Sequence, residues 1–354
     1  MDERCQRALS AGASDTPAVL VGAIPFAADA DEFIYQPEHA VASEARQLTT
    51  ATSGAHKPSD APSNALTARP SEGGYARMVE RALVRIADRH GPRLDKVVLS
   101  RQMLLENAAG LDFDRLLGVL ADDPAVTAFR ADLSETGNHL LIGATPEKLI
   151  SRTGLAIESV PLAGSMPRGR STSEDEERAA ILLASEKDHR EHAVTLEFVM
   201  DMLSPFCREL SAPDGTTLHR TASMWHLGTR VEGLLKSEDM PSAVGLAALL
   251  HPTPAVGGSP REAALSAIED LEEHDRGFYA GAVGWVDAKG DGEWYVALRC
   301  AELVAGQLIL HAGAGIVEGS VPEQEVRETA AKFRAMLRAM GVEDTLWAAR
   351  EAAE

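Results

Sequence analysis

Residues 310–332, LHAGAGIVEGSVPEQEVRETAAK, join an apolar strand to a helix through a glycine-rich segment. We expect residues 312–315 to form a turn with exposed backbone N–H groups. In the helix that follows, Glu325, Glu328 and Lys332 have the spacing i, i+3 and i+7, so their side chains share one face. That face suits Mg²⁺ beside an anionic substrate, because Mg²⁺ takes a few carboxylates and keeps other positions for ligand oxygens. Complementation of the helix dipole explains the same acidic-to-basic order, so both interpretations stay open.

Around this stretch, short apolar strands alternate with longer helical patterns. Strands are predicted at residues 19–26, 96–100, 140–144, 156–160 and 308–317, the last of which overlaps the glycine-rich segment. Residues 174–203 are predicted to form one long helix and residues 323–340 a closing helix, while residues 281–304 are predicted to form a hairpin around a Gly-Asp-Gly turn. Hairpins among the strands favour an α+β fold over a doubly wound parallel sheet. No GxGxxG or P-loop pattern supports a nucleotide site.

Composition narrows the class of protein. The chain has 354 residues, which by length alone suggests about two domains. Its formal net charge of −20 argues against nucleic acid or an anionic membrane as a partner. Residues 42–72 are dominated by Ala, Ser, Thr, Pro and Gly, a composition that cannot bury much surface and predicts a flexible loop.

Cysteine usage and the N-terminal segment indicate a compartment. Cys5, Cys207 and Cys300 are widely separated and form neither a metal-binding motif nor a disulfide framework. The N-terminal residues lack the apolar core of a signal peptide, and no apolar run approaches the length of a membrane span. We therefore expect a reducing, cytoplasmic setting.

Several ionisable residues are candidates for chemistry. Asp188, Glu191 and His192 share a helix face, which suits either a metal site or a solvated charged surface. Combined with the two glutamates of residues 310–332, Glu191 would complete an all-oxygen site, which suits Mg²⁺ better than zinc. Lys96, at the start of a strand, is either a solvent-facing lysine or a base that accepts a proton from water. Glu147 follows a proline and is either a surface residue or a general acid with a raised pKa.

Two further residues lie in apolar strands. His226, in MWHLGTR, is either a hydrogen-bonded core histidine or a ligand contact. Arg299 is predicted to be buried, and a buried arginine needs an anion, from either a partner side chain or a substrate carboxylate.

Ordered motifs from about Tyr75 to Met340 resemble one family. The motifs are TPEKLI (145–150), PLAGS (161–165), LLASEKDHREHAV (182–194), MWHLGTRVEG (224–233), LLHPTPAVGGSP (249–260), DRGFYAGAVGWVDAKGDGEWYVALRCAEL (275–303) and AGAGIVEGSVPEQEVRETAAKF (312–333). Together they resemble the chorismate-utilising enzymes, which include anthranilate, aminodeoxychorismate, isochorismate and salicylate synthases. The resemblance implies an α+β fold of two stacked, mainly antiparallel sheets flanked by helices. It also implies one catalytic domain at 73–342, with 1–41 as a strand-containing part of it, 42–72 as a loop and 343–354 as a tail.

The resemblance implies a role for each matching residue. Lys96 corresponds to the general base that activates water against ring C2 of chorismate, and Glu147 to the general acid that assists departure of the C4 hydroxyl. Glu191 and Glu328 match the Mg²⁺ carboxylates, with Asp188 and Glu325 in outer positions that act through water. The residues that match substrate-binding positions are Gly164, Ser165, His226, Ala255, Tyr279, Arg299, Gly313, Gly315 and Lys332.

The identity of the nucleophile separates the members of this family. Aminodeoxychorismate synthases place a lysine where this chain has Ala163, so water is the expected nucleophile here. Ala255 resembles the isochorismate synthases, whereas Tyr279 resembles the salicylate synthases, and His311 stands where the isochorismate group is frequently aromatic. Giving Ala255 more weight, we expect a Mg²⁺-dependent isochorismate synthase that feeds siderophore or related metabolism. Salicylate synthase and a degenerate scaffold of the same fold are the alternatives.

The resemblance also bears on partners. Chorismate is the expected small-molecule substrate, and a glutamine amidotransferase subunit is not expected. We expect a monomer, as is frequent among the family members that use water.

Overall fold

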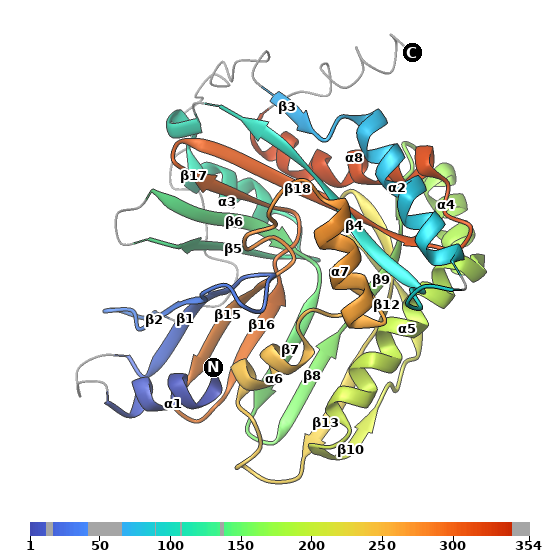
Figure 1. Cartoon of the computed structure of the whole chain (residues 1–354). Helices are drawn as coiled ribbons and strands as arrows, with labels where there is room; N and C mark the ends of the chain where they lie inside the picture. Colours follow the sequence, from blue (N-terminus) through green and yellow to red (C-terminus); the bar gives the residue numbers. More distant parts are fainter. Residues whose placement is uncertain (12–16, 42–65, 89, 107, 135–137, 342–354) are drawn as a thin grey trace.

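The computed structural model describes residues 1–11, 17–41, 66–88, 90–106, 108–134 and 138–341 (Figure 1). Most of the predicted loop at 42–72 and the predicted tail at 343–354 lie outside these residues. Within the described end of that loop segment, strand β3 (Leu66–Arg69) pairs with β4 (Lys96–Leu105), and helix α2 (Glu72–Ala87) begins. The composition of residues 42–72 does not reveal this strand, which the edge of β4 stabilises.

The strands form two large sheets and one small sheet. The eight-stranded sheet has the order β10 (Cys207–Ser211), β13 (Val231–Leu235), β8 (Ala156–Val160), β7 (Lys148–Thr153), β16 (Gly292–Val296), β15 (Ala282–Asp287), β1 (Val19–Ile24), β2 (Phe33–Tyr35). The seven-stranded sheet has the order β14 (Gly258–Ser259), β4, β18 (Gln307–Val317), β17 (Cys300–Val304), β6 (His139–Thr145), β5 (Thr127–Asp132), with β3 also on β4. The three-stranded sheet has the order β11 (Thr216–Arg220), β12 (Met224–Thr229), β9 (Leu162–Pro167).

Every strand pair among the described residues is antiparallel. The small sheet continues the eight-stranded one, because only Pro161 separates β8 from β9 and only Arg230 separates β12 from β13. In Figure 1 the seven-stranded sheet lies in the upper part of the molecule and the eight-stranded sheet in the lower part. The predicted α+β fold with mainly antiparallel sheets is confirmed.

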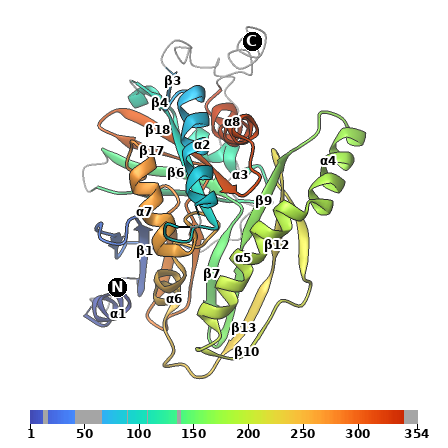
Figure 2. The same ribbon diagram turned by 45° about the vertical axis from the view of Figure 1, so that its right-hand side comes forward.

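Helices cover these sheets. They are α1 (Asp2–Ala11), α2, α3 (Phe113–Ala121), α4 (Thr172–Ala184), α5 (Glu186–Leu203), α6 (Ala243–Leu250), α7 (Arg261–Leu271) and α8 (Pro322–Ala339), with a short 3₁₀ turn at Ala108–Gly110. A cluster of buried apolar side chains from β6, β17 and β18 holds α3 and α8 on one face of the seven-stranded sheet. Figure 2 shows α5 running along β9 and β12. Among the described helices, none is long and apolar enough to cross a membrane.

The single helix predicted at residues 174–203 is wrong. Ser185 has extended backbone angles (φ −75°, ψ 106°), ends α4 and begins α5. Its hydroxyl accepts a hydrogen bond from the backbone N–H of Asp188 at 3.2 Å, which is an N-cap interaction. The break lets α5 take its own direction along β9, with α4 leading away from it (Figure 2).

The turn predicted at residues 312–315 is also wrong, because these residues lie within β18 and pair with β4, whereas the strand predicted at residues 308–317 is confirmed. Glycine is required there for close approach rather than for a turn. A Cβ at Gly315 would lie 2.4 Å from Oε1 of Glu191, and a Cβ at Gly313 would lie 2.9 Å from the Tyr279 hydroxyl oxygen. The glycines therefore make room for side chains that lie over the strand.

The hairpin predicted at residues 281–304 is correct only in its first part. β15 and β16 pair as predicted, but the chain then crosses to the other large sheet, where β17 pairs with β6 and β18. Arg299 lies at this crossing with φ +48°, a left-handed conformation that is unusual for a residue other than glycine.

Candidate active site

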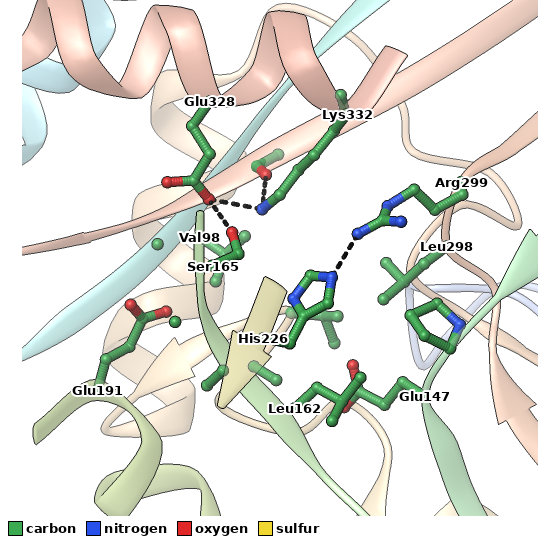
Figure 3. Close-up of a pocket in the computed structure, with 18 of the residues that line it drawn as sticks. Val98, Glu147, Leu162, Ser165, Glu191, His226, Leu298, Arg299, Glu328 and Lys332 are labelled. Atoms are coloured by element: carbon green, nitrogen blue, oxygen red, sulfur yellow. Dashed lines mark hydrogen bonds and ion pairs between the residues drawn. The ribbon is translucent and has the colours of Figure 1, made fainter. Parts of the chain in front are cut away.

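A pocket lies where strands from the sheets meet α5 and α8 (Figure 3). The predicted site residues that line it are Glu147, Gly164, Ser165, Glu191, His226, Ala255, Tyr279, Arg299, Gly313, Gly315, Glu328 and Lys332. The other three predicted residues, Lys96, Asp188 and Glu325, do not line it. Lys96 is adjacent, since its Nζ lies 2.9 Å from Oε1 of Glu191. One compact pocket therefore collects side chains from positions 147 to 332 of the chain.

Several lining residues were not predicted as site residues, although Ala163 and His311 were named as positions that differ between members of the family. They are Val98, Pro146, Leu162, Ala163, Val256, Leu298, His311 and Ala312. Most flank a predicted residue in the chain, so a wider reading of each motif would have found them. His311 differs from the others because its ring stacks on that of Tyr279 with centroids 4.8 Å apart. Its place beside Tyr279 depends on the path of β18, which the sequence alone does not reveal.

One wall of the pocket contains two carboxylates, Glu191 and Glu328, and each is paired with a lysine. Glu328 accepts a hydrogen bond from Lys332 Nζ at 2.7 Å and another from the Ser165 hydroxyl at 2.9 Å (Figure 3). Lys332 also donates to the carbonyl oxygen of Gly313 at 2.9 Å. Lys332 therefore ties α8 to β18 and holds the Glu328 carboxylate at the pocket.

Glu191 lies on α5, the neighbouring element of the same wall. Its partner Lys96 has a side chain that is 1 % exposed. Burial alone would raise the pKa of Glu191, but the ammonium groups of Lys96, Lys187 and Lys332 outweigh burial and lower it. Glu191 is therefore held as a carboxylate inside the protein.

Two more carboxylates lie behind this wall. Glu325 is 2 % exposed and receives a hydrogen bond from Lys187 Nζ at 3.1 Å. Burial, together with the nearby Glu328 carboxylate, raises the pKa of Glu325 to about 7. Burial also raises the pKa of Asp188. These two acids are held in a crowded acidic region in which a further positive charge would be stabilised.

The wall formed by Glu191, Glu328 and their lysine partners is the candidate metal site. Among the residues that the structure describes, no group of three or more His, Cys, Asp or Glu side chains is close enough together to hold a metal ion. Mg²⁺ does not require such a group, because it is usually held by one or two carboxylates together with waters and substrate oxygens. Glu191 and Glu328 both line the pocket. Because Gly315 has no side chain, the Glu191 carboxylate has room to lie against the strand there. The donor set therefore fits Mg²⁺, and water or substrate oxygens would complete the coordination.

Glu147 lies across the pocket from Glu328 and Lys332 (Figure 3). It occupies the short connection between β6 and β7, which belong to different sheets, and is 2 % exposed. Burial raises the pKa of Glu147 to about 8, against the lowering effect of the Leu162 backbone N–H and two lysine charges. A protonated carboxyl at neutral pH can donate a proton.

Arg299 supplies a cationic group on the same side of the pocket as His226. One guanidinium nitrogen, Nη2, donates to His226 Nε2 at 2.7 Å, and both residues are buried (Figure 3). Burial, with the charge of Arg299, keeps the pKa of His226 well below its usual value, so the imidazole is neutral. Within the described part of the chain, no carboxylate forms an ion pair with Arg299. The predicted anion partner is therefore left to a ligand.

A β-bulge shapes the floor between these groups. Gly164 has φ +77° and is the extra residue where β9 pairs with β12 on either side of it. A Cβ there would come within 2.9 Å of the Asp188 side chain. The bulge lets α5 pack close enough to bring Glu191 to the pocket.

A buried neutral acid, a lysine-carboxylate wall opposite it and an arginine without a carboxylate partner define an acid–base active site for a small anion. The family described as chorismate binding enzyme matches residues 18–341. The chain belongs to this family, as its motifs predicted.

Known proteins with related sequences carry more specific names. Isochorismate synthase DhbC of Bacillus subtilis is 49 % identical over 279 residues, covering 77 % of this chain and 69 % of that protein. Isochorismate synthase EntC of Escherichia coli is 39 % identical over 327 residues, covering 92 % and 81 %. A crystal structure of a putative 2,3-dihydroxybenzoate-specific isochorismate synthase, DhbC from Bacillus anthracis, superposes with a TM-score of 0.86 at 39 % identity, covering 97 % and 89 %.

Proposed function

We propose that this protein is an isochorismate synthase, which adds water at ring C2 of chorismate and releases the C4 hydroxyl. The observation that carries the proposal is the buried acid Glu147, which lies across one pocket from Glu191 and its partner Lys96, together with Arg299, which has no carboxylate partner among the described residues. Relatives at 39–49 % identity named isochorismate synthase support the same activity. The reaction is an isomerisation, since one water enters and one leaves.

Acid and base act on opposite sides of the ring. Lys96 accepts a proton from the attacking water in its neutral amine form, because the ammonium form that pairs with Glu191 has no lone pair, and the contact with Glu191 fixes the position of its Nζ. Glu147 donates its proton to the departing C4 hydroxyl, which leaves as water. The raised pKa keeps Glu147 protonated at neutral pH, so the acid is ready before substrate binds.

The two carboxylates of chorismate are bound at separate places. Arg299 and Tyr279 are proposed to bind the enolpyruvyl carboxylate, since Arg299 has no protein carboxylate to satisfy it. Lys332 and the backbone around Gly315 lie beside the ring carboxylate. His226, held neutral, fixes the Arg299 guanidinium from the other side.

Mg²⁺ is proposed to bind at the lysine-carboxylate wall. Glu191 and Glu328 would hold the ion directly, with Asp188 and Glu325 acting through water. When bound, Mg²⁺ would supply positive charge to orient the ring carboxylate. Ser165 fixes the rotamer of Glu328 by its hydrogen bond, which prepares that carboxylate for the ion.

Salicylate synthase is the second function that the sequence raised. It would require elimination of pyruvate after the same first step. The relatives' names favour isochorismate synthase over it. At the pocket itself, Ala255 adds no polar group that could orient the elimination. A degenerate scaffold is disfavoured by the intact acid, base and anion-binding residues.

We also propose that the product feeds siderophore or related metabolism, and that the protein acts as a cytoplasmic monomer without an amidotransferase subunit. Names such as "Vibriobactin-specific isochorismate synthase", given to a relative from Vibrio cholerae, support the first part. Size-exclusion chromatography with light scattering tests the monomer.

Product analysis tests the activity directly. Purified protein is incubated with chorismate, with and without Mg²⁺, and the products are separated by chromatography. We expect isochorismate in equilibrium with chorismate, formed only with Mg²⁺ and without pyruvate. Salicylate with stoichiometric pyruvate would favour the second function, and unchanged chorismate in a folded sample would favour the scaffold.

A further inference from the structure

Strand β4, which begins with Lys96, has an incomplete edge. One edge pairs with β18 over residues 96–105. On the other edge β14 pairs only with residues 96 and 97, and β3 only with residues 102–105. Between them, the backbone at 98–101 has no strand on that side, although Val98 N donates to the carbonyl oxygen of Gly257 at 2.9 Å. The remaining polar backbone groups of this gap need other partners.

Two charged side chains fill the gap. Glu272 Oε1 accepts a hydrogen bond from the backbone N–H of Ser100 at 2.7 Å. Arg276 Nη2 donates to the carbonyl oxygen of Val98 at 2.7 Å. The same arginine also donates from Nη1 to the carbonyl oxygen of Val256 at 2.9 Å. We call the Glu272–Arg276 pair the clasp, because it takes the place of a strand along this part of β4.

The clasp is a rigid, buried ion pair. Arg276 makes a two-pronged contact with Glu272, from Nε to Oε2 at 2.9 Å and from Nη2 to Oε1 at 2.6 Å. Both side chains are 2 % exposed. The guanidinium also lies 4.3 Å from the centroid of the Phe26 ring. Planar, two-pronged geometry of this kind restricts position as well as adding energy.

The backbone groups that the clasp binds belong to the pocket. Val98 and Val256 line it, and Val98 lies two residues beyond Lys96 on the same face of β4. Val256 follows Ala255 in the loop between α6 and β14. Tyr279, a third pocket residue, donates its backbone N–H to the carbonyl oxygen of Arg276 at 2.9 Å. Three separate parts of the pocket wall therefore meet at one ion pair that does not itself line the pocket.

We propose that Glu272 and Arg276 are positioning residues that set the distance between the Lys96 strand and the Ala255–Val256 loop. The proposal rests on the proposed function for its effect on rate. Substrate binding depends mainly on Arg299 and Lys332, which lie on other elements, so the clasp acts on the alignment of base and ring. A misplacement of about 1 Å can lower a rate by about 100-fold.

The substitution Arg276→Lys separates charge from geometry. Lysine keeps the positive charge beside Glu272, but a single ammonium cannot reproduce the planar fork that reaches Val98, Val256 and Glu272 together. The matched control is Arg152→Lys. Arg152 is also buried and binds the carbonyl oxygens of Met240, Pro241 and Glu238, but on the eight-stranded sheet and outside the pocket.

Two measurements on both variants test the proposal. With chorismate and Mg²⁺, we expect Arg276→Lys to lower kcat by about 10- to 100-fold with a change in KM of less than about threefold. Arg152→Lys should leave kcat within about twofold of the original protein. In amide hydrogen exchange, residues 97–101 and 254–258 should exchange at least about tenfold faster in Arg276→Lys and unchanged in Arg152→Lys.

The proposal is overturned if Arg276→Lys matches Arg152→Lys in kcat, or if the two exchange segments are unaffected. If the unmodified protein forms no isochorismate, the proposed function fails, and the exchange experiment alone decides whether the clasp holds the walls together. Should Arg276→Lys not fold, Glu272→Gln takes its place in both measurements. It keeps the shape of the side chain but removes the charge that orients the guanidinium.

Discussion

Glu147 and Glu191 lie in the same pocket and are both withdrawn from solvent, yet their pKa values move in opposite directions. Burial raises the pKa of Glu147 to about 8, and no lysine or arginine among the described residues forms a hydrogen bond with it. Glu191 has Lys96 Nζ at 2.9 Å, and the lysine charges lower its pKa despite burial. The same chemical group is thus a proton donor on one side and a permanent anion on the other.

The difference shows what divides the pocket into two halves. The charges of Lys96 and Lys332 lower the pKa of both Glu147 and Glu191. Among the described residues that line the pocket, however, direct ion pairs form only on the side opposite Glu147, at Glu191 on α5 and Glu328 on α8. Between Glu147 and Glu191, which are both buried, contact with an ammonium group therefore decides which one is ionised. An acid is needed where the C4 hydroxyl leaves, and fixed negative charge is needed where Mg²⁺ is proposed to bind.

Removing the acid has the largest expected effect. Glu147→Gln keeps the size and hydrogen-bonding shape of the side chain but cannot donate a proton to the leaving hydroxyl. We expect kcat to fall by about 10²- to 10⁴-fold, with the fold unchanged by circular dichroism. Lys96→Ala should also abolish turnover, by removing the base.

Glu302→Gln is the control for that substitution. Glu302 is buried on β17, outside the pocket, so kcat should stay within about twofold. A Glu147→Gln protein with near-normal turnover would remove Glu147 from the mechanism.

Local pattern in the sequence was sufficient for much of the fold. The apolar run at 156–160 predicted β8 with its correct bounds, and the amphipathic pattern at 323–340 predicted α8 to within one residue. Residues 140–144 likewise predicted the centre of β6. Short-range periodicity determines elements of this kind, because one face of each is buried.

Long-range contacts determine what the sequence did not reveal. The helical pattern at 174–203 does not show that Ser185 caps a new helix, since serine also occurs within helices. The crossing at Arg299 depends on which sheet accepts β17. The raised pKa of Glu147 depends on burial by segments remote in sequence. The motifs implied an acid at Glu147 and metal carboxylates at Glu191 and Glu328, but the burial and the ion pair that separate the two halves are visible only in the folded chain.

The next largest effect is expected on the anionic half. Glu328→Ala removes one of the two carboxylates that line the pocket beside the proposed ion. We expect affinity for Mg²⁺ in the presence of chorismate to fall by at least about 10- to 100-fold, measured by calorimetric titration. The matched control is Glu323→Ala, an exposed glutamate in the first turn of the same helix. Equal titrations for Glu328→Ala and the unmodified protein would exclude Glu328 as a ligand.

The smallest expected effect is on stability, and it tests whether Glu147 has the raised pKa that distinguishes it from Glu191. The pKa of Glu147 is about 8 in the folded chain against 4.5 for the ordinary group, so the folded state retains this proton over that range. Its contribution to stability is fully present below pH 4.5 and is lost as pH rises through about 8. Between pH 5 and pH 9 the unmodified protein should therefore lose stability relative to Glu147→Gln, by on the order of a few kcal/mol.

Urea unfolding at several pH values without Mg²⁺ or substrate measures this difference, because the glutamine side chain does not titrate. Other titrating groups are common to both proteins and cancel in the comparison. A difference in unfolding free energy that stays constant from pH 5 to pH 9 would mean that Glu147 has an ordinary pKa. The acid half would then resemble the Glu191 half, and the division of the pocket into donor and anion would not hold.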